Sequence, residues 1–180
     1  MGQRSTGGPA FQHLALMVRD IEASHRFYTE ALGFEQCGRL TTVPGVDFRF
    51  YRGAPDRHHD VALVQAPDPS PFPPADTAWD MFANKVGINH IAVCYPDREE
   101  FLDRLRILQD LGIEFRQRGN HGMTHSVYVS DPDGNGIEVL YELPEELWLG
   151  DVDAALNHWE NLPLEGEGAL ADPVDNPTFA

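Results

Sequence analysis

The chain has 180 residues, 42% hydrophobic and 23% charged, a composition typical of a soluble globular protein with one core. Its formal net charge of −16 disfavours a nucleic acid or an anionic membrane as partner, because both are polyanions. No segment approaches the roughly 20 apolar residues of a membrane span, and residues 1–9 contain no apolar signal core. We therefore expect a cytoplasmic protein in which the two cysteines are reduced.

The first part of the chain predicts one strand, one helix and three further strands. Residues 13–18 form an apolar run typical of a buried strand, and apolar positions at helical spacing predict a helix over residues 21–32. Gly33 stands where a helix C-cap is expected. Turn sequences separate three shorter predicted strands, at residues 35–42, 47–52 and 60–65.

A proline-rich stretch separates this module from the next. Residues 66–74 contain five prolines and predict an extended linker, and residues 79–83 are compatible with a short helix or a lid element.

The second part of the chain repeats the same order of elements. A strand is predicted at residues 89–94 and a helix at residues 98–111, followed by strands at residues 114–117, 125–129 and 136–141. After Leu143 the chain becomes acidic and proline-rich. There we expect a helix over residues 151–159 and a loose end over residues 162–180, or one draped over a partner.

Two histidines mark the repeat. His13 and His90 each open an apolar strand, and Asp20 and Asp97 follow at the same offset of 77 residues. We therefore predict an α+β fold of two tandem βαβββ modules that form a cupped mixed β-sheet, with the helices outside. The prediction is a single domain with four parts: module one at about residues 10–66, a linker at 66–87, module two at 88–143 and an acidic extension at 144–180.

A buried carboxylate completes a candidate metal site. Glu138 lies among apolar residues in the last predicted strand, where an unpaired carboxylate would be costly. A single strand histidine is more often a hydrogen-bonded core residue. Equivalent histidines at positions 13 and 90, together with Glu138, instead indicate a set of two histidines and one carboxylate, typical of non-haem Fe(II) oxygenases.

The duplicated order, the two strand histidines and the sequence Asp-Pro-Asp-Gly-Asn-Gly-Ile-Glu at residues 131–138 resemble the vicinal oxygen chelate superfamily. The resemblance covers about residues 11–143. Glyoxalase I, antibiotic-resistance proteins and type I extradiol dioxygenases belong to this superfamily. Its small single-domain extradiol dioxygenases are the most similar subgroup.

Further residues carry the resemblance to extradiol dioxygenases. His59 matches the histidine that acts there as acid–base catalyst, and Tyr128 matches a tyrosine that hydrogen-bonds a substrate oxygen. His121 lies in a segment like the one whose histidine lines the substrate pocket, although the shortness of this segment leaves His125 as the alternative. Glyoxalase I takes a fourth metal ligand from the last strand of module one, a position that falls here near Ala62 or Leu63, neither of which binds metal.

The resemblance implies a ring-cleaving dioxygenase that holds Fe(II) through His13, His90 and Glu138 and acts on a catechol with O2. Mn(II) is the alternative metal, because the same nitrogen and oxygen ligands accept it. A homodimer is compatible with the resemblance, which leaves the oligomeric state open.

Two other functions remain open. One is an isomerase, epimerase or lyase with the same fold and a metal but without O2 chemistry. The other is a metal-free protein of the resistance type that sequesters a ligand. Neither the substrate nor the position of ring cleavage follows from the sequence.

Overall fold

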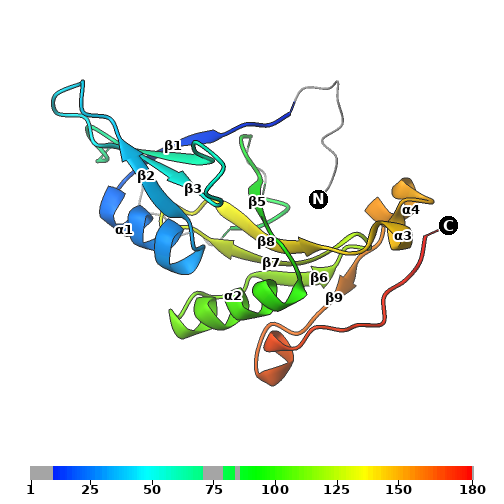
Figure 1. Cartoon of the computed structure of the whole chain (residues 1–180). Coiled ribbons are helices and arrows are strands. Elements are labelled where there is room, and N and C mark those ends of the chain that lie inside the picture. The colour runs from blue at the N-terminus through cyan, green and yellow to red at the C-terminus, as the bar shows by residue number, and fades with distance from the viewer. Residues whose placement is uncertain (1–9, 71–78, 84–85, 180) are drawn as a thin grey trace. The chain divides into compact units, whose positions relative to one another are not determined.

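A computed structural model describes residues 10–70, 79–83 and 86–179 of the chain. Residues 1–9, together with residues 71–78 and 84–85 of the predicted linker, lie outside the described residues. The fold is α+β, as predicted, and contains two separate mixed sheets. The chain divides into two compact units, Met1–Pro71 and Phe72–Ala180, each containing one sheet (Figure 1).

The first unit has the predicted β-α-β-β-β order, and its four-stranded sheet runs β1-β4-β3-β2. Strand β1 pairs in parallel with β4, and the other neighbours are antiparallel. Helix α1 continues directly into a π-helical turn, η1, and packs against β4. The bounds are β1 Leu14–Val18, α1 Ile21–Arg26, η1 Phe27–Ala31, β2 Glu35–Arg39, β3 Phe48–Arg52 and β4 Val61–Gln65.

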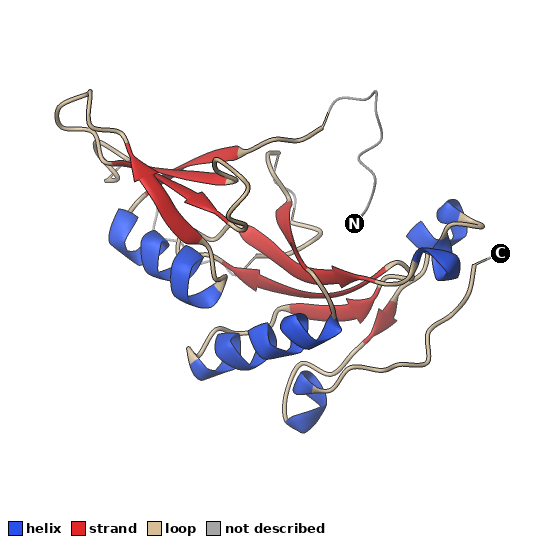
Figure 2. Cartoon of the chain, in the orientation of Figure 1, coloured by secondary structure: helices blue, strands red, loops and turns tan. Residues whose placement is uncertain are grey.

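The second unit repeats this order and adds a C-terminal segment. Its five-stranded sheet runs β5-β8-β7-β6-β9, with β5 and β8 parallel. Helix α2 runs along one face of this sheet (Figure 2). The bounds are β5 His90–Tyr95, α2 Arg98–Asp110, β6 Gln117–Asn120, β7 Thr124–Ser130, β8 Gly136–Glu142, α3 Glu145–Trp148, α4 Val152–Leu156, β9 Glu160–Asn161 and the 3₁₀ turn η2 Glu167–Leu170.

Equivalent residues begin and end the helices of both units. The Asp20 carboxylate accepts hydrogen bonds from two backbone N–H groups in the first turn of α1, and Asp97 does the same for α2. Gly33 and Gly112 follow the two helices with φ angles of 79° and 71°, a conformation that glycine adopts without strain. These caps confirm that the repeat in the sequence is a repeat in structure.

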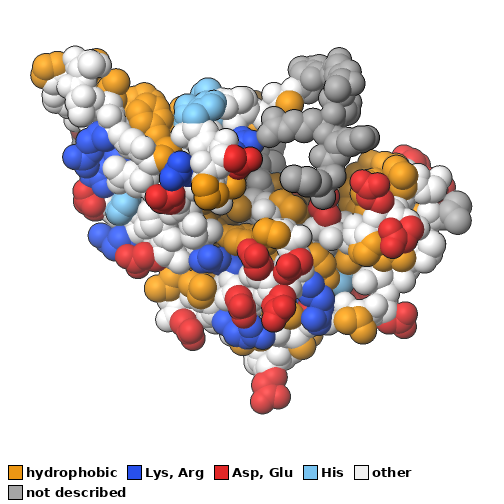
Figure 3. All heavy atoms as spheres, in the orientation of Figure 1, with side chains coloured by type: hydrophobic (Ala, Val, Ile, Leu, Met, Phe, Trp, Pro, Cys, Tyr) orange, Lys and Arg blue, Asp and Glu red, His pale blue; other side chains and the backbone are white. Residues whose placement is uncertain are grey.

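The core of the second unit lies between α2 and one face of its sheet. Phe101, Leu105 and Leu108 of α2 are fully buried, as are Ile137 and Val139 of β8. Because side chains alternate along a strand, Glu138 points to the opposite face. The exposed side of α2 carries interspersed acidic and basic side chains (Figure 3), among them the ion pair of Asp103 and Arg106.

Three predicted elements differ from the structure. The strand predicted at residues 114–117 is wrong, because β6 comprises Gln117–Asn120 and pairs with β7 on one side and β9 on the other. The helix predicted over residues 151–159 covers only Val152–Leu156, and residues 79–83 form turns without a helix.

The C-terminal segment is not loose. Ala169 and Asp172 are buried, and residues 160–161 form a strand of the sheet. The expectation that residues 162–180 form a loose end is therefore wrong for the described part of that segment. Among the helices of the described residues, none is long and apolar enough to cross a membrane.

Candidate functional site

Glu138 lies in the middle of β8 and is 7% exposed. The hydroxyl of Tyr128, the residue directly opposite on β7, donates a hydrogen bond of 2.7 Å to Glu138 Oε1. Burial and the hydrogen bond to this carboxylate raise the pKa of Tyr128, so that the phenol keeps its proton at neutral pH. Tyr128 therefore holds one oxygen of Glu138 in place and leaves the other free for a different partner.

His90 supplies that partner from the neighbouring strand. Its Nε2 lies 3.2 Å from Glu138 Oε2. Its Nδ1 lies 2.7 Å from Oδ1 of Asn89, whose Nδ2 donates to the carbonyl of Met81. Because Asn89 Oδ1 can only accept, Nδ1 of His90 carries a proton and directs Nε2 toward the carboxylate. Nε2 of His90 and Oε2 of Glu138 thus face one another from neighbouring strands, as two ligands of one cation would.

Two tryptophans flank Tyr128 on this face of the sheet. Trp79 is stacked on Tyr128, with 4.9 Å between ring centroids and 4° between ring planes. Trp159 lies on the other side, with its ring centroid 6.4 Å from that of Tyr128. Both indoles lie over glycines: a Cβ atom on Gly136 would come within 2.2 Å of Trp79, and one on Gly119 within 2.4 Å of Trp159. The two glycines thus make room for the two tryptophans.

The two alternative pocket histidines lie on opposite faces of the second sheet. His121 follows β6 and makes an edge contact with Trp159 at 5.6 Å between ring centroids, on the face of Glu138. His125 pairs with Tyr141 across β7 and β8 and is fully buried on the face covered by α2. Of the two candidates, only His121 therefore shares a face with Glu138.

His125 instead belongs to a buried polar group, here termed the Asp172 cluster. Asp172 comes from the C-terminal segment and is contacted by three side chains of the sheet: His125 at 2.9 Å, Tyr141 at 2.7 Å and Arg118 at 3.2 Å. Burial acts to raise the pKa of Asp172, but the hydrogen bonds from His125 and Tyr141 and the charge of Arg118 outweigh it and hold the pKa below its usual value. This cluster attaches the C-terminal segment to the sheet of the second unit.

The first unit gathers the other predicted histidines at one end of its sheet. His13 immediately precedes β1, and its ring centroid lies 4.5 Å from that of His59. Nδ1 of His13 is hydrogen-bonded to Oε1 of Gln12, just as Nδ1 of His90 is bonded to Asn89. Burial first, and then the neighbouring His13 and His58, lower the pKa of His59. The predicted metal ligand and the predicted acid–base residue of module one therefore lie side by side.

Strand register identifies the residues of the first unit that correspond to Glu138 and Tyr128. Ala92 of β5 pairs with Glu138, and Ala15, the equivalent residue of β1, pairs with Ala62. Ala62 in turn lies opposite Phe50, as Glu138 lies opposite Tyr128. The first unit therefore has an apolar pair where the second has a carboxylate and a phenol.

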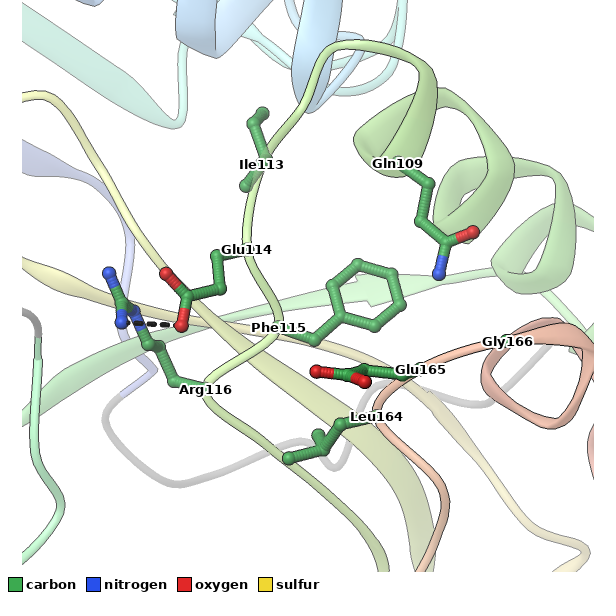
Figure 4. A pocket seen from close by; sticks show the side chains of 8 residues that line it. All are labelled: Gln109, Ile113, Glu114, Phe115, Arg116, Leu164, Glu165 and Gly166. Carbon is green, nitrogen blue, oxygen red and sulfur yellow. Dashed lines mark ion pairs between the residues drawn. The ribbon is translucent and has the colours of Figure 1, made fainter.

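A hollow of about 490 Å³ in the second unit lies apart from these residues (Figure 4). It is lined by the end of α2, residues 113–116 and residues 164–166, and Glu114 and Arg116 form an ion pair of 2.8 Å on its wall. Its lining contains no histidine, so we do not assign it to the candidate site.

The described residues contain no single group of three or more His, Cys, Asp or Glu side chains arranged to bind a metal ion. The predicted ligands are instead divided between the units, with His13 in the first and the pair of His90 and Glu138 in the second. Sequence reasoning did not find the roles of Gln12, Asn89 and Trp159. For Gln12 and Asn89 a signal was available, since both are carboxamides directly before a repeat histidine.

The model of the glyoxalase/bleomycin resistance protein/dioxygenase superfamily matches residues 10–139. The chain belongs to this superfamily. The resemblance inferred from the repeat and its histidines is thereby confirmed. The match ends just after Glu138, so that residues 140–180 of this superfamily member lie beyond it.

The chain resembles proteins of this superfamily whose activities differ from one another. It is 30% identical over 141 residues to a biphenyl-2,3-diol 1,2-dioxygenase of Rhodococcus globerulus, with 77% of this chain and 67% of the relative covered. A catechol-2,3-dioxygenase of Bacillus subtilis is 29% identical over 136 residues, which cover 76% of this chain and 42% of the relative. A lactoylglutathione lyase of Pseudomonas putida is 29% identical over 163 residues, which cover 74% of this chain and 86% of the lyase. The chain thus spans less than half of the catechol dioxygenase.

Solved structures show the same fold. A glyoxalase/bleomycin resistance protein/dioxygenase domain from Frankia sp. EAN1pec matches with a TM-score of 0.55 and 21% identity, covering 77% of this chain and all of that domain. At 21% sequence identity, this structural similarity is evidence for the fold of the chain.

Proposed function

We propose that the chain is a metal-dependent extradiol dioxygenase that cleaves a catechol-type ring with O2. The observation that carries the proposal is the strand register, which puts Ala62 where the second unit has Glu138. Module one therefore lacks the fourth ligand that the resemblance to glyoxalase I would require. A metal held by only three side chains keeps positions open for substrate and O2, as non-haem iron oxygenases require.

The proposed metal ligands are His13, His90 and Glu138, and the whole chain is proposed to be a single domain. The donor set fits a divalent cation, because His90 Nε2 and Glu138 Oε2 are directed at one another at 3.2 Å. Fe(II) is the proposed metal, with Mn(II) as the alternative that the same ligands accept. When bound, iron would supply the coupling between triplet O2 and a singlet catechol that organic side chains cannot supply.

The side chains around the ligands have distinct proposed roles. Gln12 and Asn89 keep Nδ1 of His13 and His90 protonated, so that Nε2 of each is available as a ligand. Tyr128, itself buried, holds Glu138 in place through its 2.7 Å hydrogen bond. His59, next to His13, is the proposed acid–base residue that takes a proton from a catechol hydroxyl and returns it to the product. His121 is the proposed pocket histidine.

The reaction balances without an external reductant. One carbon–carbon bond of the ring, next to a hydroxylated carbon, is broken, and both atoms of O2 enter the ring-opened product. The catechol supplies the four electrons that reduce O2. A small-molecule catechol and O2 are therefore the proposed partners of the site, within the metabolism of aromatic compounds.

Oxygen uptake by anaerobically Fe(II)-loaded protein is the test. The protein is offered catechols with hydrogen, alkyl, aryl or carboxyl substituents, while O2 consumption and a yellow ring-fission product are followed. We expect uptake and colour with at least one catechol, and loss of both in Glu138→Gln. Glu142→Gln is the matched control, because Glu142 lies on the same strand but is exposed.

Metal content after loading separates the outcomes. Stoichiometric iron that is lost in Glu138→Gln, with ring cleavage in the parent, supports the proposal. Tight metal binding without any oxygen uptake would overturn the dioxygenase assignment.

A lyase or isomerase is the second candidate function. It is favoured by the lactoylglutathione lyase of Pseudomonas putida, since this chain covers 86% of that protein. Ala62 argues against it for the reason given above. Metal-dependent conversion of a hemithioacetal, with no O2 consumed, would establish this alternative.

A further inference from the structure

Trp159 comes from the part of the chain that follows the superfamily match at residues 10–139. Its indole nevertheless lies on the same face of the second sheet as Glu138 and Tyr128, over the backbone of Gly119. Any side chain larger than hydrogen at Gly119 would occupy this place, because its Cβ would lie 2.4 Å from the indole. The sheet is thus shaped to accept this one ring.

The backbone around Trp159 is firmly attached to the second unit. Strand β9, Glu160–Asn161, pairs with β6, and the N–H of Leu162 donates to the carbonyl of Arg118 at 3.0 Å. Asn161 Oδ1 also accepts a 2.8 Å hydrogen bond from the indole Nε1 of Trp159. Further along, the Asp172 cluster fastens the segment to the opposite face of the same sheet. The segment that carries Trp159 is therefore attached to both faces of the sheet and is not a free tail.

The polar edge of Trp159 is satisfied, but its ring is only half-buried. The ring contacts His121 at 5.6 Å and Tyr128 at 6.4 Å between centroids. It therefore prolongs the row of rings that starts at the buried Tyr128, whose hydroxyl is bound to Glu138. A partly exposed indole at the end of such a row offers an apolar face to a flat ligand.

The distance from Glu138 to Trp159 indicates which part of a ligand the indole could contact. Glu138 is on β8, Tyr128 on β7, and Trp159 lies over β6, so Trp159 is two strands away from Glu138. With neighbouring strands about 4.8 Å apart, this separation is about 10 Å. A catechol ring whose hydroxyl groups lie at Glu138 is too small to reach Trp159, whereas a second ring attached to it extends that far.

We propose that Trp159 is a specificity-determining residue that contacts the second aromatic ring of an aryl-substituted catechol. The proposal rests on the proposed function in one respect, namely that the hydroxyl groups of the substrate lie at Glu138. It assigns to the C-terminal segment a part of the substrate site that residues 10–139 do not supply. Trp79, on the other side of Tyr128, then borders the ring that is cleaved.

The test compares the dissociation constants of catechol and 3-phenylcatechol without turnover. Titration calorimetry of the full chain, loaded with Fe(II) and kept free of O2, gives both constants for the parent and for Trp159→Leu, Trp159→Phe and Trp148→Phe. Trp148 is the matched control, because its indole donates to the carbonyl of Leu143 and makes no ring contact with Tyr128 or His121 among the described contacts. Loss of one aromatic contact corresponds to a weakening of about threefold to tenfold.

The expected result is a parent that prefers 3-phenylcatechol, a preference lowered about threefold to tenfold in Trp159→Leu, with the catechol constant unchanged. Trp159→Phe should keep most of the preference, and Trp148→Phe all of it. An unchanged preference in Trp159→Leu overturns the proposal. Equal weakening of both ligands also overturns it, since that pattern indicates a structural role.

A fluorescence measurement keeps the test valid if Trp159→Leu does not fold. The chain has three tryptophans, so the double variant Trp79→Phe/Trp148→Phe leaves Trp159 as the single reporter. Its emission should be quenched saturably by 3-phenylcatechol and not by catechol. Absence of quenching by a ligand that calorimetry shows to bind contradicts the proposal.

Oxygen uptake separates this proposal from the proposed function. Ring cleavage with a preference that does not depend on Trp159 leaves the dioxygenase and removes the role of Trp159. A Trp159-dependent preference in binding, without O2 consumption, leaves the aryl site and removes the dioxygenase.

Discussion

The two units share one scaffold and differ in what each places on it. Both begin with a histidine whose Nδ1 is bonded to the preceding carboxamide, and both cap their helix with an aspartate. At the equivalent place in the sheet, the first unit has Ala62 beside Phe50 and the second has Glu138 beside Tyr128. The repeated pattern thus provides two equivalent histidines, whereas the carboxylate is present in one copy.

The C-terminal segment is the second difference. Within the described residues, only the second unit has a fifth strand, β9, and the buried Asp172 cluster. In this segment Trp159 reaches the Glu138 face while Asp172 reaches the other face of the same sheet. The second unit is therefore the more elaborate of the two, and the following predictions test whether its additions do what their contacts indicate.

The largest expected effect is on stability. Asp172→Ala should lower the free energy of unfolding by about 3–5 kcal/mol, because it leaves buried Arg118 and His125 without their carboxylate. Urea unfolding followed by circular dichroism measures the change. Asp175→Ala is the control, since Asp175 is exposed in the same segment and should change stability by no more than about 0.5 kcal/mol. Equal values for the two variants would show that the cluster does not fasten the segment.

The same cluster predicts a pH dependence. The pKa of Asp172 is held below its usual value of 3.8 in the folded protein, so its ionised form stabilises the fold above that pH. This contribution is lost as the pH falls through the folded-state pKa. The difference in unfolding free energy between the parent and Asp172→Asn should therefore be constant near neutral pH and shrink in acid. A difference that grows on acidification would contradict this assignment.

A smaller effect is expected at the pair of Tyr128 and Glu138. Tyr128→Phe removes the donor to a buried carboxylate and should cost about 1.5–3 kcal/mol of unfolding free energy in the metal-free protein. The matched change in the first unit is Phe50→Tyr, where the residue opposite is Ala62 and offers no acceptor. We expect that variant to differ from the parent by no more than about 0.5 kcal/mol. Similar costs for both would remove the distinction between the two sheets.

The carboxamides test whether both units contribute a metal ligand. Gln12→Ala and Asn89→Ala should each weaken metal binding about 10–100-fold, because each leaves a ligand histidine unoriented. Competition with a chromophoric chelator gives the dissociation constants. Asn89→Asp retains an acceptor for His90 Nδ1 and should restore much of the affinity. If only Asn89→Ala has an effect, the first unit does not supply a ligand in the proposed way.

The smallest effect should be equal in the two units. Asp20→Ala and Asp97→Ala each remove a helix cap that accepts two backbone N–H bonds, at a cost of about 1 kcal/mol each. Thermal unfolding of the two variants measures the costs. A clear inequality would show that the repeat is less symmetrical in energy than in geometry.

The sequence alone was sufficient for the repeated scaffold. Strands, helices and their caps follow from local periodicity and from residues close in the chain, so the β-α-β-β-β order could be read directly. The repeat placed the counterpart of Glu138 only near Ala62 or Leu63, and the strand register then identified it as Ala62. Strand β6 was misplaced because Gly119 and Asn120 have weak strand character, and their pairing comes from β7 and the distant β9.

The tertiary structure decided the contacts between segments that lie far apart in the chain. His121 and His125 are four residues apart and equally plausible in sequence, yet their places in the sheet put them on opposite faces. Asp172 is 47 residues from His125, and no local pattern pairs them. Local periodicity determines which residues form a strand or helix. Which distant side chain then covers that element depends on the packing of the whole unit, and this packing brought Trp159 to the Glu138 face.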